Sequence, residues 1–290
     1  MQTDAPQTHQ SDNLSTAWLH LLNQVRGKHS AESRTLIIEC GKDGPREDTS
    51  IRQTLDAKLR ELELGSVNET ADTIFPAFQW SLFSRQWKGD LTTVEAREAF
   101  YRHYLTRFMP KYLARRKATK CKSSMTETYF SRMINFHARP IADWTLMDSQ
   151  IERSIAFINH YLYDVDHKSR PRVSGLSIPV FNPDRDHSQK NLYGQSLGGF
   201  PCLQQVSLAV GDRSESHGLT LHAFYPSESI FDRGYGNYLG FVHLGKFIGQ
   251  ATKLPLNRIS IYIAHAMLGN AKPSDVTQFF NDKAPSKANA

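Results

Sequence analysis

Apolar side chains recur at helical spacing in several parts of the chain. Near its start, Trp18 and Leu22 fall on one face together with the apolar residues one turn away. Thr49 or Ser50 is expected to cap a second such stretch, and Pro110 is expected to break or kink a third, because proline has no backbone N–H to donate. The spacing predicts helices over residues 16–29, 49–65, 92–114, 148–164 and 236–252.

Short apolar or alternating runs, bounded by turn residues, predict strands between these helices. They cover residues 34–40, 174–183, 203–211, 217–227 and 257–268. Helices alternate irregularly with strands that are expected to pair mainly antiparallel. This order indicates an α+β fold in which a mixed sheet is packed with helices and the N-terminal third is helical. We expect a single domain over residues 16–280, with disordered polar tails at 1–15 and 281–290.

Composition agrees with a globular chain and excludes several classes of protein. The 290 residues are 39% hydrophobic and 22% charged, which is typical of a soluble globular protein. Apolar runs fall short of the roughly 20 residues that span a bilayer, so we expect no membrane association. The first residues lack the apolar centre of a secretory leader, and we therefore expect a cytoplasmic location.

The basic charge balance points to anionic partners. The formal net charge is +6, and cations are concentrated in residues 109–122. This run alone would support a nucleic-acid-binding module. A solvated helix end is the simpler explanation, so we favour nucleotides over nucleic acid as partners.

The three cysteines, Cys40, Cys121 and Cys202, are odd in number and widely spaced, so we expect no disulfide framework. Metal-ligand spacing is also missing, and we expect no metal site. A nucleophilic cysteine needs a nearby cation or helix N-terminus to lower its pKa. Taken alone, Cys202 is better explained as a buried structural residue, because free cysteine is among the most buried residue types.

The spacing around Cys202 changes that interpretation. Pro201-Cys202 precedes one strand, Ser227 ends the next, and Asn237 follows ten residues later at the start of an apolar helix. Three upstream segments keep the same order, at residues 128–136, 149–158 and 177–186. Together these six pieces, within residues 128–268, resemble the thymidylate synthase family.

The resemblance implies covalent chemistry on a pyrimidine ring. In that family a thiolate adds to C6, and C5 then attacks a one-carbon unit supplied by 5,10-methylenetetrahydrofolate. It implies that Cys202 is the nucleophile and that Tyr129 belongs to the proton-handling network. It also implies that Asn237 reads the pyrimidine edge, that Ser227 contacts the phosphate, and that the protein is a homodimer.

Several positions depart from the family pattern. Pro226 stands where the family has an arginine near the thiol and phosphate, and Ser229 stands where it has an aspartate. The family's catalytic glutamate has no clear counterpart, and Glu95 and Glu98 are candidates by position only. Substitute phosphate ligands are proposed among the arginines, namely Arg132, Arg170, Arg172 and Arg233.

The sequence therefore predicts a divergent pyrimidine C5 one-carbon transferase that uses a cysteine nucleophile. It would methylate or hydroxymethylate a pyrimidine nucleotide or nucleoside. The alternative is a protein of the same fold that binds a pyrimidine nucleotide but has lost turnover. The substituted arginine and aspartate and the unplaced glutamate motivate this alternative.

Overall fold

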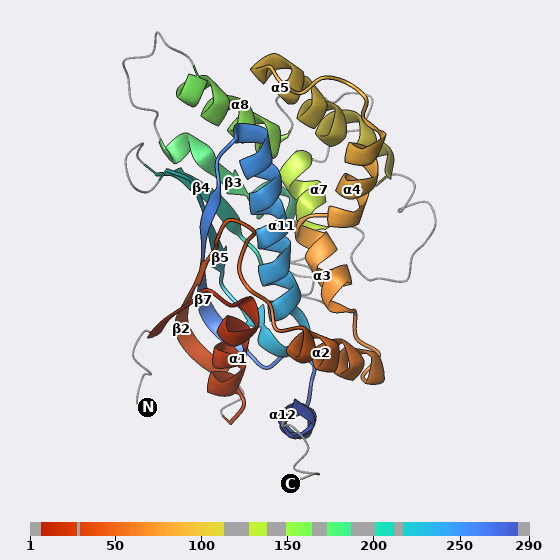
Figure 1. The fold of residues 1–290 in the computed structure, drawn as a ribbon. Coiled ribbons are helices and arrows are strands. Elements are labelled where there is room, and N and C mark those ends of the chain that lie inside the picture. Colours follow the sequence, from red (N-terminus) through yellow and green to blue (C-terminus); the bar gives the residue numbers. More distant parts are fainter. Residues whose placement is uncertain are drawn as a thin grey trace.

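The computed structural model describes residues 7–27, 30–112, 128–137, 149–163, 173–186, 201–211 and 217–283. They form a mixed sheet with helices packed on it (Figure 1). The strand order is β1 (Gln7–Ser11), β2 (Ser30–Glu39), β7 (Leu256–Met267), β5 (Leu219–Tyr225), β4 (Gln205–Val210) and β3 (Ser177–Pro179), and β6 (Glu228–Ser229) pairs with β7.

Parallel and antiparallel pairs are combined in this sheet. The pairs β1–β2, β5–β7 and β6–β7 are parallel, whereas β2–β7, β4–β5 and β3–β4 are antiparallel. The predicted mixed sheet packed with helices is therefore confirmed.

Helices connect the strands and gather on one side of the sheet (Figure 1). The α-helices are α1 (Leu14–Val25), α2 (Thr49–Glu61), α3 (Val67–Ile74), α4 (Ala77–Gln86), α5 (Val94–His103), α7 (Tyr129–Ile134), α8 (Gln150–Tyr163), α9 (Pro183–Asp186), α11 (Tyr235–Thr252) and α12 (Pro273–Lys283). Two π-helical segments, η1 (Tyr104–Phe108) and η4 (Ile230–Gly234), and one 3-10 segment, η3 (Val173–Leu176), complete the described chain.

Helix α11 runs through the centre of the molecule because its surface is apolar on nearly every side (Figure 1). Glycines let neighbouring segments approach it closely. A Cβ atom on Gly240 would lie 2.8 Å from the Ala71 carbonyl oxygen of α3, and one on Gly245 would lie 2.7 Å from the Leu256 side chain of β7. The helix is therefore held between α3 and the sheet, and both of its ends have fixed positions.

The sheet buries one face under the helices and leaves the other face open. Along β5, Leu221 and Tyr225 are buried, whereas Phe224 is exposed. Along β7, Ile261 is buried and Tyr262 is exposed. This period-2 alternation is the signature of a sheet with one solvated face.

The structure corrects several sequence predictions at element ends. Residues 7–11 of the expected N-terminal tail form β1, because their backbone pairs with β2 even though their side chains are polar. The N-terminal third is therefore not wholly helical. At the other end, α12 extends to residue 283, into the expected C-terminal tail.

Helix starts also differ from expectation. Asp48, rather than Thr49 or Ser50, caps α2, because its carboxylate accepts the backbone N–H groups of Ser50 and Ile51 at 2.9 and 3.3 Å. Helix α11 begins at Tyr235 because η4 runs directly into it without an intervening turn. The helix before Pro110 changes to π-helical geometry over η1, where the Met109 N–H donates to the Tyr104 carbonyl.

Within the described ranges, every helix is too short or too polar to cross a membrane. Most of the basic run at residues 109–122 lies outside these ranges.

Candidate active site

Polar side chains from six segments, β5 and η4 among them, meet at the N-terminal end of α11. Tyr129 is the first residue of α7, Cys202 precedes β4, Glu228 lies on β6, and Asn237 and Tyr238 occupy the first turn of α11. Hydrogen bonds or mutual charge effects link them. This group, here called the Cys202 cluster, consists of Tyr129, Cys202, Tyr225, Glu228, Arg233, Asn237 and Tyr238.

Glu228 lies at the centre of the cluster and is 1% exposed. The parallel pairing of β6 with β7 holds it there, opposite Ala266. Its Oε1 accepts a hydrogen bond from Asn237 Nδ2 at 2.9 Å, and its Oε2 accepts one from the Tyr238 hydroxyl at 3.1 Å. Burial raises the pKa of Glu228 to about 7, and the two hydrogen bonds limit the rise. Its carboxyl group can therefore both take up and release a proton near neutral pH.

Cys202 is exposed as a residue, yet the groups packed around its sulfur desolvate it. This desolvation raises the pKa of the thiol, and the negative charge of Glu228 raises it further. A hydrogen bond from the Tyr129 hydroxyl and the positive charge of Arg233 act in the opposite direction. Burial and the charge of Glu228 therefore favour the thiol form of Cys202.

Two tyrosines line the same region. Burial raises the pKa of Tyr129, while its oxygen accepts the backbone N–H of Leu203, which leaves its own proton for the sulfur of Cys202. Tyr225 is fully buried, and its hydroxyl has no hydrogen-bond partner among the described residues. It lies close enough to Glu228 and Cys202 for their charges to raise its pKa, after the larger effect of burial.

Segment η4 contributes charges of both signs. Arg233 is half-buried and lowers the pKa of both Cys202 and Tyr129. Asp232 is buried; its Oδ2 accepts a hydrogen bond from Asn270 Nδ2 at 2.8 Å, and its Oδ1 has no partner within the described chain. Arg233 therefore lies where the sequence suggested a substitute for the missing family arginine.

Arg132 does not lie free in this cluster. Its Nη1 atom forms a buried ion pair with Asp186 at 2.8 Å and also contacts the Val180 carbonyl at 3.3 Å. This pairing joins α7 to α9 and satisfies the guanidinium charge inside the protein. The predicted role of Arg132 as a phosphate ligand stays a prediction, and in this arrangement its charge is paired with Asp186. Arg170 and Arg172 lie outside the described residues.

Ser227 lies beside Glu228 but makes a different contact. It is half-buried between β5 and β6, and its Oγ atom lies 3.8 Å from the Met267 sulfur. A sulfur acceptor binds a hydroxyl only weakly, so this side chain is easily drawn to a better partner. Its predicted contact with a phosphate stays a prediction.

The glutamates predicted by position lie in another part of the fold. Glu98 on α5 accepts a hydrogen bond from Asn159 of α8 at 3.2 Å. The Arg102–Glu152 ion pair joins the same two helices. Glu98 therefore belongs to the packing of α5 on α8, and Glu228 is the carboxyl group beside Cys202.

Sequence reasoning missed Glu228 and Tyr225. Both flank Pro226-Ser227, and the resemblance already placed this motif near the thiol, so their position in the sequence was the signal that could have found them. Among the described residues, histidine, cysteine and carboxylate side chains form no group of three or more that could hold a metal ion.

Comparison with known proteins adds little to this geometry. No protein-family model and no curated protein sequence matches the chain. Among solved structures, the thermostable thymidylate synthase A from Bacillus subtilis is similar with a TM-score of 0.33 and 14% sequence identity. The match covers 49% of this chain and 43% of that one, so it spans less than half of either. A likeness of this size establishes neither a common fold nor a function.

Proposed function

We propose that this protein is an enzyme that activates C5 of a pyrimidine nucleotide or nucleoside for one-carbon transfer, with Cys202 as the nucleophile. The transferred unit would be a methyl or hydroxymethyl group. One observation supports this above the others: Cys202, Tyr129 and Asn237, which the resemblance singled out in the sequence, all contact one another or Glu228 in a single cluster.

The cluster can support addition of the thiol to the ring. As the sulfur of Cys202 bonds to C6, the C5=C6 electron pair shifts towards C4 and its substituent, which makes C5 an enolate-like carbon, and the thiol proton passes to the Glu228 carboxylate. Protonation of Glu228 removes its negative charge from beside the sulfur, and the Tyr129 hydrogen bond stabilises the sulfur as it loses its proton, before the bond to C6 is complete. After C5 has gained its substituent and lost its proton, the sulfur–C6 bond breaks and the ring double bond returns.

Asn237 is suited to hold the pyrimidine edge. One of its amide N–H groups is donated to Glu228 at 2.9 Å, which fixes the orientation of the side chain. The amide oxygen and the second N–H stay available to the ring, so the side chain can both accept and donate. The same hydrogen bond links base recognition to the group that handles the proton.

For the one-carbon donor we propose 5,10-methylenetetrahydrofolate, on the resemblance alone. The described residues do not fit it as well as they fit the pyrimidine, because Ser229 replaces the aspartate that the resemblance implies. No step is therefore derived through this donor.

We further propose that the protein is a homodimer formed through the open face of the sheet. Phe224 and Tyr262 are exposed there and stack with ring centroids 5.8 Å apart. Exposed aromatic side chains on a sheet face are typical of a protein–protein contact. Sedimentation velocity should give a dimer for the wild type and a monomer for Tyr262→Glu; a wild-type monomer would contradict this arrangement.

Exchange of the C5 hydrogen tests the proposed chemistry without the donor. Wild-type protein is incubated with 5-tritiated dUMP, dCMP or the free nucleosides, and tritium released to water is counted. Addition of the sulfur at C6 makes C5 exchangeable, so release is expected with at least one substrate. Absence of release from the whole panel, with donor added as well as omitted, would exclude cysteine-mediated C5 activation of these substrates.

Binding without turnover is the second candidate function. The raised pKa of Cys202 favours it, because it disfavours the thiolate that a nucleophile needs. The ion pair of Arg132 with Asp186 also favours it, because the pairing engages a candidate phosphate ligand. Calorimetry against the same nucleotide panel separates the two. Binding without tritium release supports this candidate, and release excludes it.

A further inference from the structure

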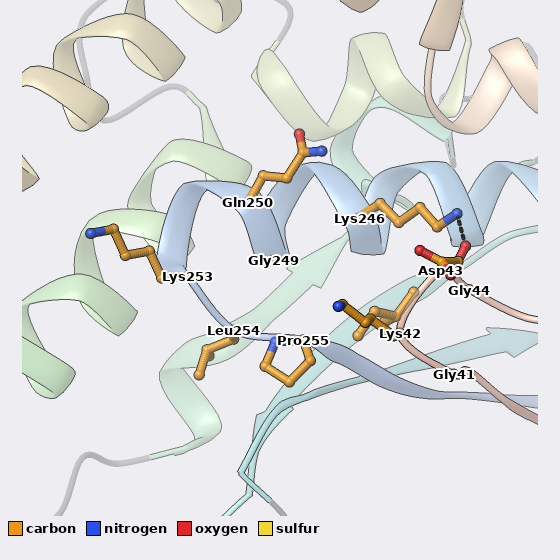
Figure 2. Close-up of a pocket in the computed structure, with 11 residues that line it drawn as sticks. Gly41, Lys42, Asp43, Gly44, Lys246, Gly249, Gln250, Lys253, Leu254 and Pro255 are labelled. Atoms are coloured by element: carbon orange, nitrogen blue, oxygen red, sulfur yellow. Dashed lines mark hydrogen bonds between the residues drawn. The ribbon is translucent and has the colours of Figure 1, made fainter. Parts of the chain in front are cut away.

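The far end of α11 borders a second feature, a cavity of about 470 Å³. Figure 2 shows its walls: the loop at residues 41–44, the last two turns of α11, and the turn that leads into β7. A cavity of this volume falls within the range of small-molecule sites, which runs from about 300 to 1,000 Å³. We call it the lysine cavity, because its described lining includes Lys42, Lys246 and Lys253.

The wall formed by α11 follows from helical periodicity. Lys246, Gly249, Gln250 and Lys253 are spaced i, i+3, i+4 and i+7 and so share one face of the helix. Lys253 adopts a left-handed conformation as the C-cap, with φ of 57°, and ends the helix. The backbones of Lys246 and Lys253 lie about 10 Å apart along the axis at about 1.5 Å per residue, and their side chains extend away from each other, that of Lys246 towards the loop at residues 41–44 (Figure 2).

The opposite wall is tied to the helix. Lys246 Nζ donates a hydrogen bond to the Asp43 backbone carbonyl at 2.5 Å (Figure 2). Gly44 has a φ of 98°, and a Cβ atom there would lie 2.7 Å from the Lys246 side chain. Glycine at this position lets the lysine reach across the loop, so the cavity has a defined edge.

The positive charge of this cavity is not neutralised within the described chain. Lys42, Lys246 and Lys253 form no ion pair there, and Asp43 is the acidic residue among the described lining residues. Some other surface cations do have acidic partners, for example Arg52, which pairs with Glu47 at 2.8 Å. The hydrogen bond of Lys246 goes to a neutral carbonyl group and leaves its charge available.

The C-terminal end of a helix carries a partial negative charge, which opposes an anion. This effect amounts to about half an elementary charge and is largest when the last carbonyl groups are free. Here the Gly249 carbonyl accepts the backbone N–H groups of Lys253 and, at 2.9 Å, Leu254. Three lysines therefore outweigh the helix end and Asp43.

We propose that the lysine cavity binds a small molecule that carries a chain of phosphate groups, as an oligophosphate or the phosphates of a nucleotide. The three lysines are spread along the lining rather than gathered at one point, so a chain of linked anionic groups can meet more of them than a single group can. Asn237 of the Cys202 cluster lies nine residues before Lys246 on α11, about 14 Å along the axis at about 1.5 Å per residue. The site is therefore separate from the proposed active site and does not depend on the proposed function.

Calorimetry with inorganic tripolyphosphate and pyrophosphate, at low salt and on the full chain, tests this site. Tripolyphosphate should bind more tightly than pyrophosphate. Lys42→Gln, Lys246→Gln and Lys253→Gln should each weaken binding about tenfold, the loss expected for one charged hydrogen bond. Lys88→Gln and Lys272→Gln are matched controls, because both lysines are exposed and lie outside the lining; they should bind as the wild type does.

Three results would overturn the proposal: no binding of tripolyphosphate, equal affinity in all variants, or equal losses in the controls. Lys42→Gln is the decisive variant, since Lys42 is exposed and makes no hydrogen bond within the described chain, so its loss does not threaten folding. Tighter binding of a single-stranded oligonucleotide, lost in the same variants, would reassign the cavity to a nucleic-acid surface. Cys202→Ala should bind tripolyphosphate normally, which keeps this test separate from the proposed catalysis.

Discussion

Helix α11 joins two regions that use polar groups in opposite ways. At its N-terminal end, Glu228 is buried, both of its oxygens accept hydrogen bonds, and its pKa is raised to about 7. At its C-terminal end, Lys246 and Lys253 face water. Burial suits a group to proton transfer, because it brings the pKa close to the working pH. Exposure suits a charge to attracting a ligand from solution, and so the two ends are expected to respond differently to mutation.

The largest expected effect is at the thiol. Cys202→Ala should reduce tritium release from a 5-tritiated pyrimidine nucleotide by at least about a thousandfold, because the sulfur that bonds to C6 is lost. Cys40→Ala is the matched control: Cys40 is half-buried, and burial raises its pKa to about 12, so it stays a thiol. Equal release from the two variants would place the chemistry elsewhere.

Glu228 should make the stability of the fold depend on pH. Its pKa is raised from 4.5 to about 7 in the fold, so folding favours the protonated carboxyl group. The contribution is fully present below about pH 4.5 and is lost as the pH rises through about 7. By linkage it amounts to about 3 kcal/mol in the free energy of unfolding.

Urea denaturation of wild type and Glu228→Gln at several pH values measures this contribution. The glutamine can accept from Asn237 and donate to the Tyr238 hydroxyl, so the variant keeps the contacts without the charge. The wild type should lose stability relative to the variant between pH 5 and 8. Glu95 is exposed, so the free energy of unfolding of Glu95→Gln should change with pH in parallel with that of the wild type. Parallel curves for Glu228→Gln as well would show that the carboxyl group is not titrating in the fold.

Arg233 should increase the reactivity of the Cys202 thiol, and its removal should have a smaller effect than the two substitutions above. Its charge lowers the pKa of Cys202, so Arg233→Gln should move the pH dependence of iodoacetamide alkylation upward and slow the reaction several-fold near neutral pH. Arg233→Lys should restore part of the rate. The lysines of the cavity provide the contrast, since Lys246→Gln should leave the alkylation rate unchanged. An unchanged profile in Arg233→Gln would remove this arginine from the Cys202 cluster.

The smallest expected effect comes from Tyr225. Tyr225→Phe removes a buried hydroxyl that has no hydrogen-bond partner in the described chain, and it should stabilise the fold by about 1 kcal/mol. Weaker nucleotide binding in the same variant would show that the hydroxyl meets the ligand. Destabilisation together with unchanged binding would show instead that it has a structural partner.

The sequence predicted those parts of the fold whose patterns are local. Helix α11 was recognised from its long apolar run, and β5 and β7 from their alternation. Strand β1 was missed because its polar side chains lie at the sheet edge, where backbone pairing with β2, rather than a hydrophobic pattern, defines the strand.

The candidate site could be predicted only in part, for a similar reason. Spacing identified Cys202 and Asn237, because both lie at the start of recognisable elements. Glu228 lies on a two-residue strand, and its position is fixed by pairing with Ala266, far along the chain. Arg132 and Asp186 are likewise paired across distant segments. Such contacts depend on tertiary packing, which local periodicity does not encode.

The most direct test of the account is a covalent adduct on Cys202. The protein is incubated with 5-fluoro-dUMP or 5-fluoro-dCMP, with and without methylenetetrahydrofolate, and the adduct is located by peptide mass spectrometry. We predict a mass increase on the peptide that contains Cys202, absent in Cys202→Ala and retained in Cys40→Ala. An adduct on another residue, or no adduct with a ligand that calorimetry shows to bind, would contradict the assignment of Cys202 as the nucleophile.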